Sequence, residues 1–402
     1  MSPLTTSAFS DEAVRLDLLR QRAFNLRWAQ QPADVIPLTA ADPDFPACEA
    51  IREELVRYVN DGVLSYGPAE GLPAFRESVA EWINTSRQIA SDAGHIFATD
   101  SAASGMAVVA RTSLKNGDEV LIPDPVDFLF QHTVERAGAV AVRVPVTQTT
   151  TSEEFIRELA ARMTSRTRML WLCNPHNPLG VVYSREWLLQ VCEWAVGKGL
   201  RILSDEIWSD IIYSPHRHTS IAALSPEIAR NTVTVYGFSK NFGLAGLRVG
   251  CVICTNPEWL KNIVATSDAA STVYGVSVLS QVAVIAAVRH GRAWLNEFIR
   301  HLQSQRDFVV ERLSRWPGVT VSPPHGTYVA FPSIKDLDDD SERFCEMLHR
   351  EARVALVPGA PRWFGPGAQG HVRICFATSR AILKEAFDRM DAVIKPMVPA
   401  TR

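Results

Sequence analysis

Lys240 lies in a Ser- and Gly-rich loop, residues 236–250 (YGFSKNFGLAGLRVG), where a lysine adds little to packing. An amine that condenses with an aldehyde cofactor must sit where its positive charge can be lost. Ser239, Arg248 and backbone N–H groups of the same loop are suited to holding the phosphate of such a cofactor. An isolated Ser-Lys pair is usually a solvated surface feature. The interpretation of Lys240 as a Schiff-base lysine therefore depends on matching residues upstream.

Two polar residues upstream follow apolar runs that read as buried parallel strands. Asn177 stands between two prolines in residues 173–180 (CNPHNPLG), and a rigidly held amide can bind a cofactor hydroxyl or a carboxylate. Asp205 ends the run 202–205, and at the same sheet edge its carboxylate can keep a pyridine nitrogen protonated. That arrangement makes pyridoxal phosphate (PLP) an electron sink. Taken singly, the Asn-Pro pairs are also ordinary turn formers and Asp205 an ordinary helix cap.

The elements that must position these residues alternate between apolar strands and amphipathic helices, which predicts an α/β fold with a mostly parallel sheet covered on both faces. Further along the chain, a long helical stretch over 276–316 leads to a second part, and an N-terminal helix over 11–28 is expected to pack with that part. The strands of the large sheet are predicted at 95–99, 119–122, 140–144, 169–173, 202–205, 233–236 and 249–254, and those of the second part near 319 and at 327–331, 354–357 and 372–376.

Composition is that of ordinary globular material large enough for two domains, with 402 residues, 47% hydrophobic and 21% charged. The net charge of −3 and the lack of a basic stripe argue against nucleic-acid binding, and no apolar run is long enough for a membrane span. The start of the sequence lacks signal-peptide features, and seven scattered cysteines suggest a reducing, cytoplasmic location. Cys251 and Cys254 have redox-motif spacing but read as core strand, and His216 and His218 read as a polar loop, so no metal site is expected.

The order N-P-x-N-P-x-G, then D-E-I, then S-K with an arginine eight residues on resembles the class I/II aminotransferase superfamily of fold-type I PLP enzymes. The resemblance covers nearly the whole chain and implies a seven-stranded, mostly parallel sheet with one reversed strand, plus a smaller α+β domain. It implies an N-terminal segment, 1–37, that packs with the small domain, a large PLP-binding domain, 38–285, and a small domain, 286–402.

Carried over to this sequence, the resemblance makes Lys240 the residue that holds PLP as an aldimine and then removes the substrate's Cα proton. Asp205 becomes the partner of the pyridine nitrogen, Asn177 a contact of the ring hydroxyl and the substrate carboxylate, and Ser239 with Arg248 the phosphate ligands.

Three further regions match in the same order. Tyr66 resembles a tyrosine that reaches the phosphate in the neighbouring subunit, which implies a homodimer. Arg373 resembles the arginine that clamps the substrate α-carboxylate, a role that suits a planar guanidinium. Ala102 and Ala103, in a segment opening a helix through Leu114, resemble the phosphate cradle at a helix N-terminus.

Two positions depart from the aminotransferase pattern. Trp208 occupies the place of a tyrosine that commonly donates to the ring hydroxyl, and an indole N–H can donate but cannot ionise. Asp127 falls where an aromatic residue usually stacks on the pyridine ring. Phe128 would stack there after a shift of one residue; alternatively the ring stacks on something unusual, or Asp127 is simply solvated beside a packing Phe128. The strings CNPHNP and DEIxSD resemble the cystathionine β-lyase branch.

The sequence therefore predicts a PLP enzyme acting on an α-amino acid, with β-elimination of a cysteine S-conjugate (a C–S lyase) slightly favoured over transamination to a 2-oxo acid. Decarboxylation, oxidative deamination and a non-catalytic homologue stay open. We expect the substrate side chain to be selected by loops around Trp28, Asp44, Phe128, Tyr274 and Trp363.

Overall fold

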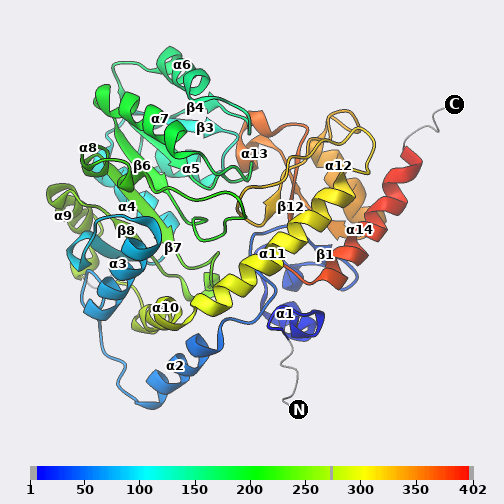
Figure 1. Cartoon of the computed structure of the whole chain (residues 1–402), viewed down its shortest axis with the longest axis horizontal. Helices are drawn as coiled ribbons and strands as arrows, with labels where there is room; N and C mark the ends of the chain where they lie inside the picture. Colours follow the sequence, from blue (N-terminus) through cyan, green and yellow to red (C-terminus); the bar gives the residue numbers. More distant parts are fainter. Residues whose placement is uncertain (1–6, 272–274, 398–402) are drawn as a thin grey trace.

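The computed structural model describes residues 7–271 and 275–397 of the chain (Figure 1). Tyr274, expected near the substrate, lies outside the described residues.

At the centre is a seven-stranded sheet with the strand order β2-β8-β7-β6-β5-β3-β4. β8 runs antiparallel to both of its neighbours, and the remaining strands are parallel. The mostly parallel sheet with one reversed strand agrees with the fold that the resemblance implies. The strands are β2 (Ile96–Thr99), β3 (Glu119–Asp124), β4 (Val140–Pro145), β5 (Thr167–Cys173), β6 (Arg201–Asp205), β7 (Thr232–Gly237) and β8 (Gly250–Ile253).

Helices cover both faces of this sheet, which explains the continuous apolar runs of its strands. Along β5, Leu170 and Leu172 pack into the core cluster formed with α6 and α7, whereas Met169 and Trp171 belong to the larger core on the other face. Successive strand residues point to opposite faces, so a strand buried on both sides must be apolar throughout. The surrounding helices are α3 (Pro73–Arg87), α4 (Ala102–Ser113), α5 (Leu129–Arg136), α6 (Ser152–Arg162), α7 (Arg185–Gly197), α8 (Pro226–Arg230), α9 (Pro257–Thr266) and α10 (Val278–His290).

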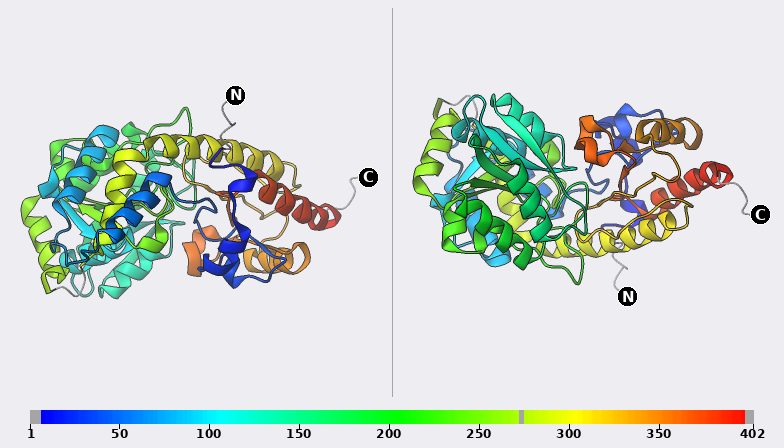
Figure 2. Two further views of the ribbon diagram at one scale, coloured as in Figure 1. Left: turned by 90° about the horizontal axis from the view of Figure 1, so that it is seen from below. Right: turned by 90° about the horizontal axis from the view of Figure 1, so that it is seen from above.

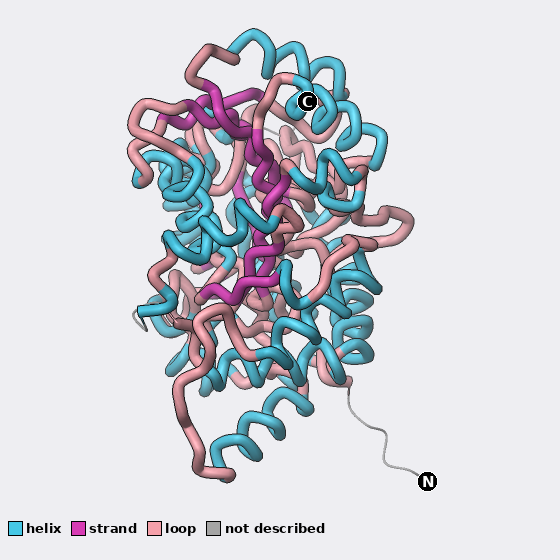
Figure 3. The backbone as a smooth tube through the Cα atoms, turned by 90° about the vertical axis from the view of Figure 1, so that its left-hand side faces the viewer, coloured by secondary structure: helices cyan, strands magenta, loops and turns pink. Residues whose placement is uncertain are grey.

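The long helix α11 (Arg292–Leu313) leads from the sheet to a second group of elements (Figures 1 and 2). There β11, β12 and β9 form a small antiparallel sheet, and β1, from the N-terminal segment, pairs in parallel with β10. Strands run through the middle of the molecule with helices outside them (Figure 3). The elements of this part, with the remaining N-terminal helices, are α1 (Leu16–Arg22), β1 (Ile36–Pro37), α2 (Glu49–Asn60), β9 (Val329–Ala330), α12 (Ser341–Met347), β10 (Val354–Ala355), β11 (Val357–Pro358), α13 (Pro361–Phe364), β12 (Val372–Cys375) and α14 (Arg380–Ile394).

Two expectations about local structure are wrong in detail. The single helix over 11–28 is replaced by short helical pieces, because Val14, Arg15 and Ala23 leave helical dihedral angles, and Asn25 and Leu26 then have left-handed φ angles of 61° and 66°. The long helical stretch over 276–316 is present, as two helices that meet at Gly291. The strand near 319 is only an isolated bridge between Thr320 and Ser333.

All seven cysteines are buried and free, including Cys251 and Cys254 on or beside the core strand β8. In the described part of the chain, no helix combines the length and apolar character needed to cross a membrane.

The start of β8 passes close beneath the first residues of α4. A Cβ added at Gly250 would lie 2.7 Å from the Ala102 amide nitrogen and 2.8 Å from the Tyr236 carbonyl oxygen. Backbone cannot move aside as a flexible side chain can, so only glycine fits here.

We expect Gly250→Ala to destabilise the protein by about 1–3 kcal/mol, because the added methyl group must push α4 away from the sheet. The measurement is the midpoint of urea unfolding. Gly246→Ala is the matched control, since no atom lies within 4 Å of its added Cβ. Equal midpoints for the two variants would contradict the close approach of α4 and β8.

Candidate active site

A pocket opens at the edge of the sheet where β5, β6 and β7 end, between the large sheet and the C-terminal elements. Ligands of α/β sheets bind at this edge because loops from several strands meet there. The predicted site residues that line the pocket are Ala102, Ala103, Phe128, Asn177, Asp205, Trp208, Ser239, Lys240, Arg248 and Arg373.

Lys240, which lines this pocket, is held by the backbone of residues shortly after β1. Its Nζ donates a hydrogen bond of 2.6 Å to the Ala41 carbonyl oxygen, which also accepts from the Tyr328 hydroxyl at 3.2 Å. Nζ lies 5.4 Å from the centre of the Trp208 ring. Burial lowers the pKa of Lys240, while the Asp42 carboxylate opposes that shift. The amine is thus more easily neutral than an exposed lysine, as a nucleophile or base requires.

A buried ion pair fixes the loop that carries Lys240. Asp210 binds Arg87 of α3 at 2.7 Å and accepts a hydrogen bond of 2.7 Å from Asn241, the residue after Lys240. The hydroxyl of Tyr236, on β7, also donates to Asp210. Side chains from three elements therefore set the position of the lysine.

Asp205 is a buried carboxyl group, and one of its two oxygens accepts no hydrogen bond from nitrogen or oxygen among the described residues. Its Oδ1 accepts from the Ile207 amide at 3.1 Å, whereas the nearest polar group recorded for Oδ2 is the Cys173 thiol at 4.0 Å. Burial raises the pKa of Asp205 to about 7, and the nearby carboxylates of Asp127 and Glu206 add to the rise. A protonated nitrogen placed against Asp205 would stabilise its ionised form.

Arg373, Asn177 and Asp127 form a chain of hydrogen bonds across the pocket. Arg373 donates to Asn177 Oδ1 at 3.2 Å and to the Thr39 carbonyl oxygen at 3.3 Å, and Asn177 Nδ2 donates to Asp127 at 2.9 Å. The Arg373 Nε is buried and has no hydrogen-bond partner among the described residues. The arginine thus keeps donor capacity for an incoming carboxylate.

Asp127 is therefore not a solvated surface residue. Besides binding Asn177, it accepts a hydrogen bond of 3.1 Å from the Leu129 amide at the start of α5. Phe128 is 39% exposed and meets the Trp363 ring edge-on, with ring centres 5.9 Å apart.

The other end of the pocket is suited to an anion. The first residues of α4, Ala102 and Ala103, lie there with Ser239 and Arg248, and Ser101 caps the helix through the Ser104 amide. Helix N-termini favour phosphate because their N–H groups are free and the helix dipole is positive there. Arg248 is exposed, and no hydrogen bond or ion pair of its guanidinium is found among the described residues.

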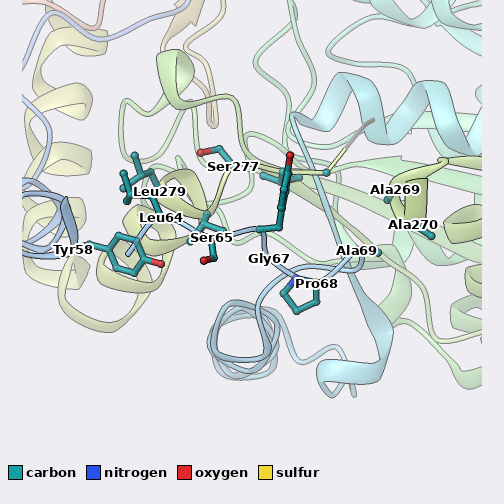
Figure 4. A pocket seen from close by; sticks show the side chains of 14 residues that line it. Tyr58, Leu64, Ser65, Gly67, Pro68, Ala69, Ala269, Ala270, Ser277 and Leu279 are labelled. Atoms are coloured by element: carbon teal, nitrogen blue, oxygen red, sulfur yellow. The ribbon is translucent and has the colours of Figure 1, made fainter. Parts of the chain in front are cut away.

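Tyr66 is not brought to this pocket within one chain. It is 91% exposed and lines a separate groove, between residues 64–69 and the segment around Ala269 and Ser277 (Figure 4).

The loops expected to select the substrate divide into two groups. Phe128 and Trp363 line the pocket, whereas Trp28 and Asp44 are buried beside it. Asp44 accepts from the Trp28 indole at 2.8 Å and forms an ion pair with Arg27, so this pair anchors the N-terminal segment instead.

Sequence reasoning missed the contributions of the backbone at residues 39–41 and of Tyr328. Lys240 and Arg373 bind the carbonyl oxygens of Ala41 and Thr39, which any residue type would supply, so no sequence signal marks them. Tyr328 begins a short apolar run far along the chain, and only its position beside Trp208, 4.6 Å between ring centres, indicates a role.

This set of residues fits PLP. An unpaired cation and a helix N-terminus suit the phosphate, the buried Asp205 suits the ring nitrogen, and a lysine with lowered pKa lines the same pocket. In the described residues no group of His, Cys, Asp and Glu is arranged to hold a metal ion.

Comparison with known proteins agrees with this geometry. A family model described as aminotransferase class I and II matches residues 33–390. An aspartate aminotransferase of Pyrococcus abyssi is 33% identical over 388 residues, which cover 95% of this chain and 97% of that protein.

Solved structures with the same fold include enzymes of two kinds. An aromatic aminotransferase of Pyrococcus horikoshii superposes with a TM-score of 0.84 at 32% identity, covering 96% of this chain and 100% of that one. A protein described as a PLP-dependent β-cystathionase, from Corynebacterium diphtheriae, superposes with a TM-score of 0.85 at 27% identity, covering 95% and 98% of the two chains.

Replacement of Arg373 by lysine should weaken binding of small carboxylates, including amino acids, by about ten- to a hundredfold, because the charge remains but the forked pair of donors is lost. The measurement is the apparent dissociation constant from titration of the cofactor-loaded protein. Arg350→Lys, at an exposed position, is the matched control. Loss of the cofactor itself in Arg373→Lys would show that the arginine belongs to the cofactor site.

Proposed function

The chain belongs to the aminotransferase class I and II family, and from that premise we propose that it transfers the amino group of an α-amino acid to a 2-oxo acid. It is a PLP-dependent enzyme. The observation that carries the proposal is the near full-length similarity to relatives named aminotransferases, at 33% identity for the Pyrococcus abyssi enzyme. This choice reverses the slight preference for β-elimination drawn from the sequence, because these relatives favour the alternative given there.

The residues at the pocket have a consistent division of labour in this proposal. Bound PLP supplies a ring that withdraws electrons from the substrate's Cα. Asp205 would hold the protonated ring nitrogen, and that positive charge would compensate the burial that otherwise raises the pKa of Asp205. Ser239, Arg248 and the first amides of α4 would hold the phosphate, and Asn177 would contact the ring hydroxyl.

The substrate is positioned by Arg373 and deprotonated by Lys240. Arg373 binds the α-carboxylate, with Thr39 and Asn177 holding its guanidinium in place. Lys240 Nζ removes the proton from the substrate's Cα and can afterwards donate a proton to a neighbouring atom. Its lowered pKa supports this role, because a general base must be neutral before it can accept a proton.

Elimination of a thiol from a cysteine S-conjugate is the second candidate. The similarity to the β-cystathionase at 27% identity favours it, together with Trp208 in place of the tyrosine typical of aminotransferases. Elimination needs a leaving group on Cβ but no second substrate, so the two candidates differ in whether an acceptor is required.

The deciding experiment is incubation of the PLP-loaded enzyme with common amino acids plus 2-oxoglutarate, and separately with cysteine S-conjugates alone. We expect product only when a 2-oxo acid is present, with the cofactor passing to its amine form when the acceptor is withheld. Lys240→Ala should lower turnover by several orders of magnitude, whereas Lys261→Ala, exposed on α9, should leave it unchanged.

Release of thiol, pyruvate and ammonia without an acceptor would replace this proposal by elimination. Consumption of dioxygen or release of carbon dioxide would contradict both candidates.

We further propose that the enzyme is a homodimer in which Tyr66 binds the phosphate in its partner's site. Several large apolar residues near Tyr66 are exposed in the single chain, and α2, which carries two of them, stands at the margin of the molecule (Figure 1). Exposed apolar surface of this kind is typical of an interface. These residues are Val56, Val59, Val63 and Leu64.

Mixing two inactive variants tests this arrangement. In a mixed dimer of Lys240→Ala and Tyr66→Ala, one site receives an intact Lys240 and, from its partner, an intact Tyr66. After dissociation and reassociation of the mixture, activity should recover to about a quarter of the wild-type value, because half of the dimers each regain one site. No recovery, with both variants still dimeric by light scattering, would place Tyr66 in its own chain's site.

A further inference from the structure

Aromatic side chains form the wall of the pocket beside Arg373. The Arg373 guanidinium lies 5.1 Å from the centre of the Phe364 ring, and the neighbouring Trp363 ring meets Phe128 edge-on. Val357 packs in the same apolar cluster, and Leu26 also lines the pocket. A substrate whose α-carboxylate is bound by Arg373 therefore has this surface within reach of its side chain.

Backbone contacts fix the two aromatic segments against each other. The Phe128 amide donates to the Trp363 carbonyl oxygen at 2.8 Å, and the Val126 amide donates to the Phe364 carbonyl oxygen at 2.9 Å. The wall is thus built jointly by the loop after β3 and by α13, and backbone hydrogen bonds hold the two segments together. Rigid aromatic surfaces of this kind favour flat apolar groups.

The charged residues of the pocket also favour an uncharged substrate side chain. Among the described residues that line it, the cations are Lys240, Arg248 and Arg373, and each has a role with the cofactor or the α-carboxylate. The anions are Asp205, which is assigned to the ring nitrogen, and Asp127. A second carboxylate on the substrate therefore finds no unassigned cation in this part of the chain.

Asp127 lies close enough to act on the binding groups. After burial, it is the largest influence on the pKa of Arg373, which it raises, and it also raises the pKa of Lys240. Its carboxylate binds Asn177, which in turn binds Arg373. A negative side chain brought into the pocket would meet this fixed negative charge, and such repulsion discriminates between ligands of similar size.

We propose that the pocket takes α-amino acids with large uncharged side chains, aromatic ones foremost, and selects against acidic ones, with Phe128 and Trp363 forming the side-chain subsite and Asp127 repelling carboxylates. This rests on the proposed aminotransferase activity. The residues that carry it, Phe128, Trp363 and Asp127, all line the pocket of this chain.

The test is the first half of the reaction, followed without an acceptor. PLP-loaded enzyme is mixed with phenylalanine, tyrosine, aspartate, glutamate, arginine or lysine, and conversion of the cofactor to its amine form is followed by absorbance. The rate per unit concentration should be about tenfold or more higher for the aromatic amino acids than for any charged one.

Two variants assign the effect to the named residues. Phe128→Leu should lower the conversion rate with phenylalanine and tyrosine more than with the other amino acids. Phe24→Leu, at an exposed position outside the pocket, should leave the conversion rate unchanged for every amino acid. Asp127→Asn should raise the rate with aspartate relative to phenylalanine, because it removes the negative charge at nearly constant shape.

Three outcomes would overturn the inference: fastest conversion by aspartate or glutamate, as a cation from a second subunit would cause; fastest conversion by arginine or lysine; or equal slowing of all donors in Phe128→Leu. Failure of every amino acid to convert the cofactor would instead count against the proposed function, so the two failures are distinguishable.

Discussion

The covering of both sheet faces by helices is the constraint on which the site depends. Because the strands are buried on both sides, their interiors are mostly apolar, with only small hydroxyl side chains such as Ser204 and Thr234, and the charged and amide side chains of the site lie where the strands end. Asn177 after β5, Asp205 at the end of β6 and Lys240 after β7 are such side chains. Neighbouring strands of a sheet lie about 4.7–4.9 Å apart. Residues at the ends of adjacent strands are therefore close in space although they are far apart in the sequence.

Burial then gives these groups their reactivity. Asp205 has its pKa raised and Lys240 has its pKa lowered for the same reason, since each loses solvation of its charged form. A cofactor that brings a protonated nitrogen to one and an aldehyde to the other compensates both losses. The pocket is therefore electrostatically prepared for PLP.

The N-terminal and C-terminal parts complete what the sheet begins. Lys240 and Arg373 both bind carbonyl oxygens of residues 39–41, and the buried Arg27–Asp44 ion pair holds the same segment. Breaking one partner of such a pair leaves an uncompensated charge, so the anchoring is sensitive to single substitutions. The fold is shared by enzymes of different activity, and the reaction and substrate must be decided by residues such as Asp127, Trp208 and Trp363.

The sequence by itself determined the sheet, most of its strand positions and the residues that gather at its edge. Apolar runs bounded by polar strand ends are local patterns, and Asn177, Asp205, Ser239 and Lys240 lie in short strings next to such runs. Tertiary structure alone decided that the first helix ends before the left-handed residues Asn25 and Leu26, that Asp127 binds Asn177, and that the Ala41 carbonyl holds Lys240. It also left Tyr66 outside its own chain's pocket. These features depend on contacts between segments up to 199 residues apart, as for Lys240 and Ala41, and on backbone groups common to all residue types, so neither periodicity nor residue identity encodes them.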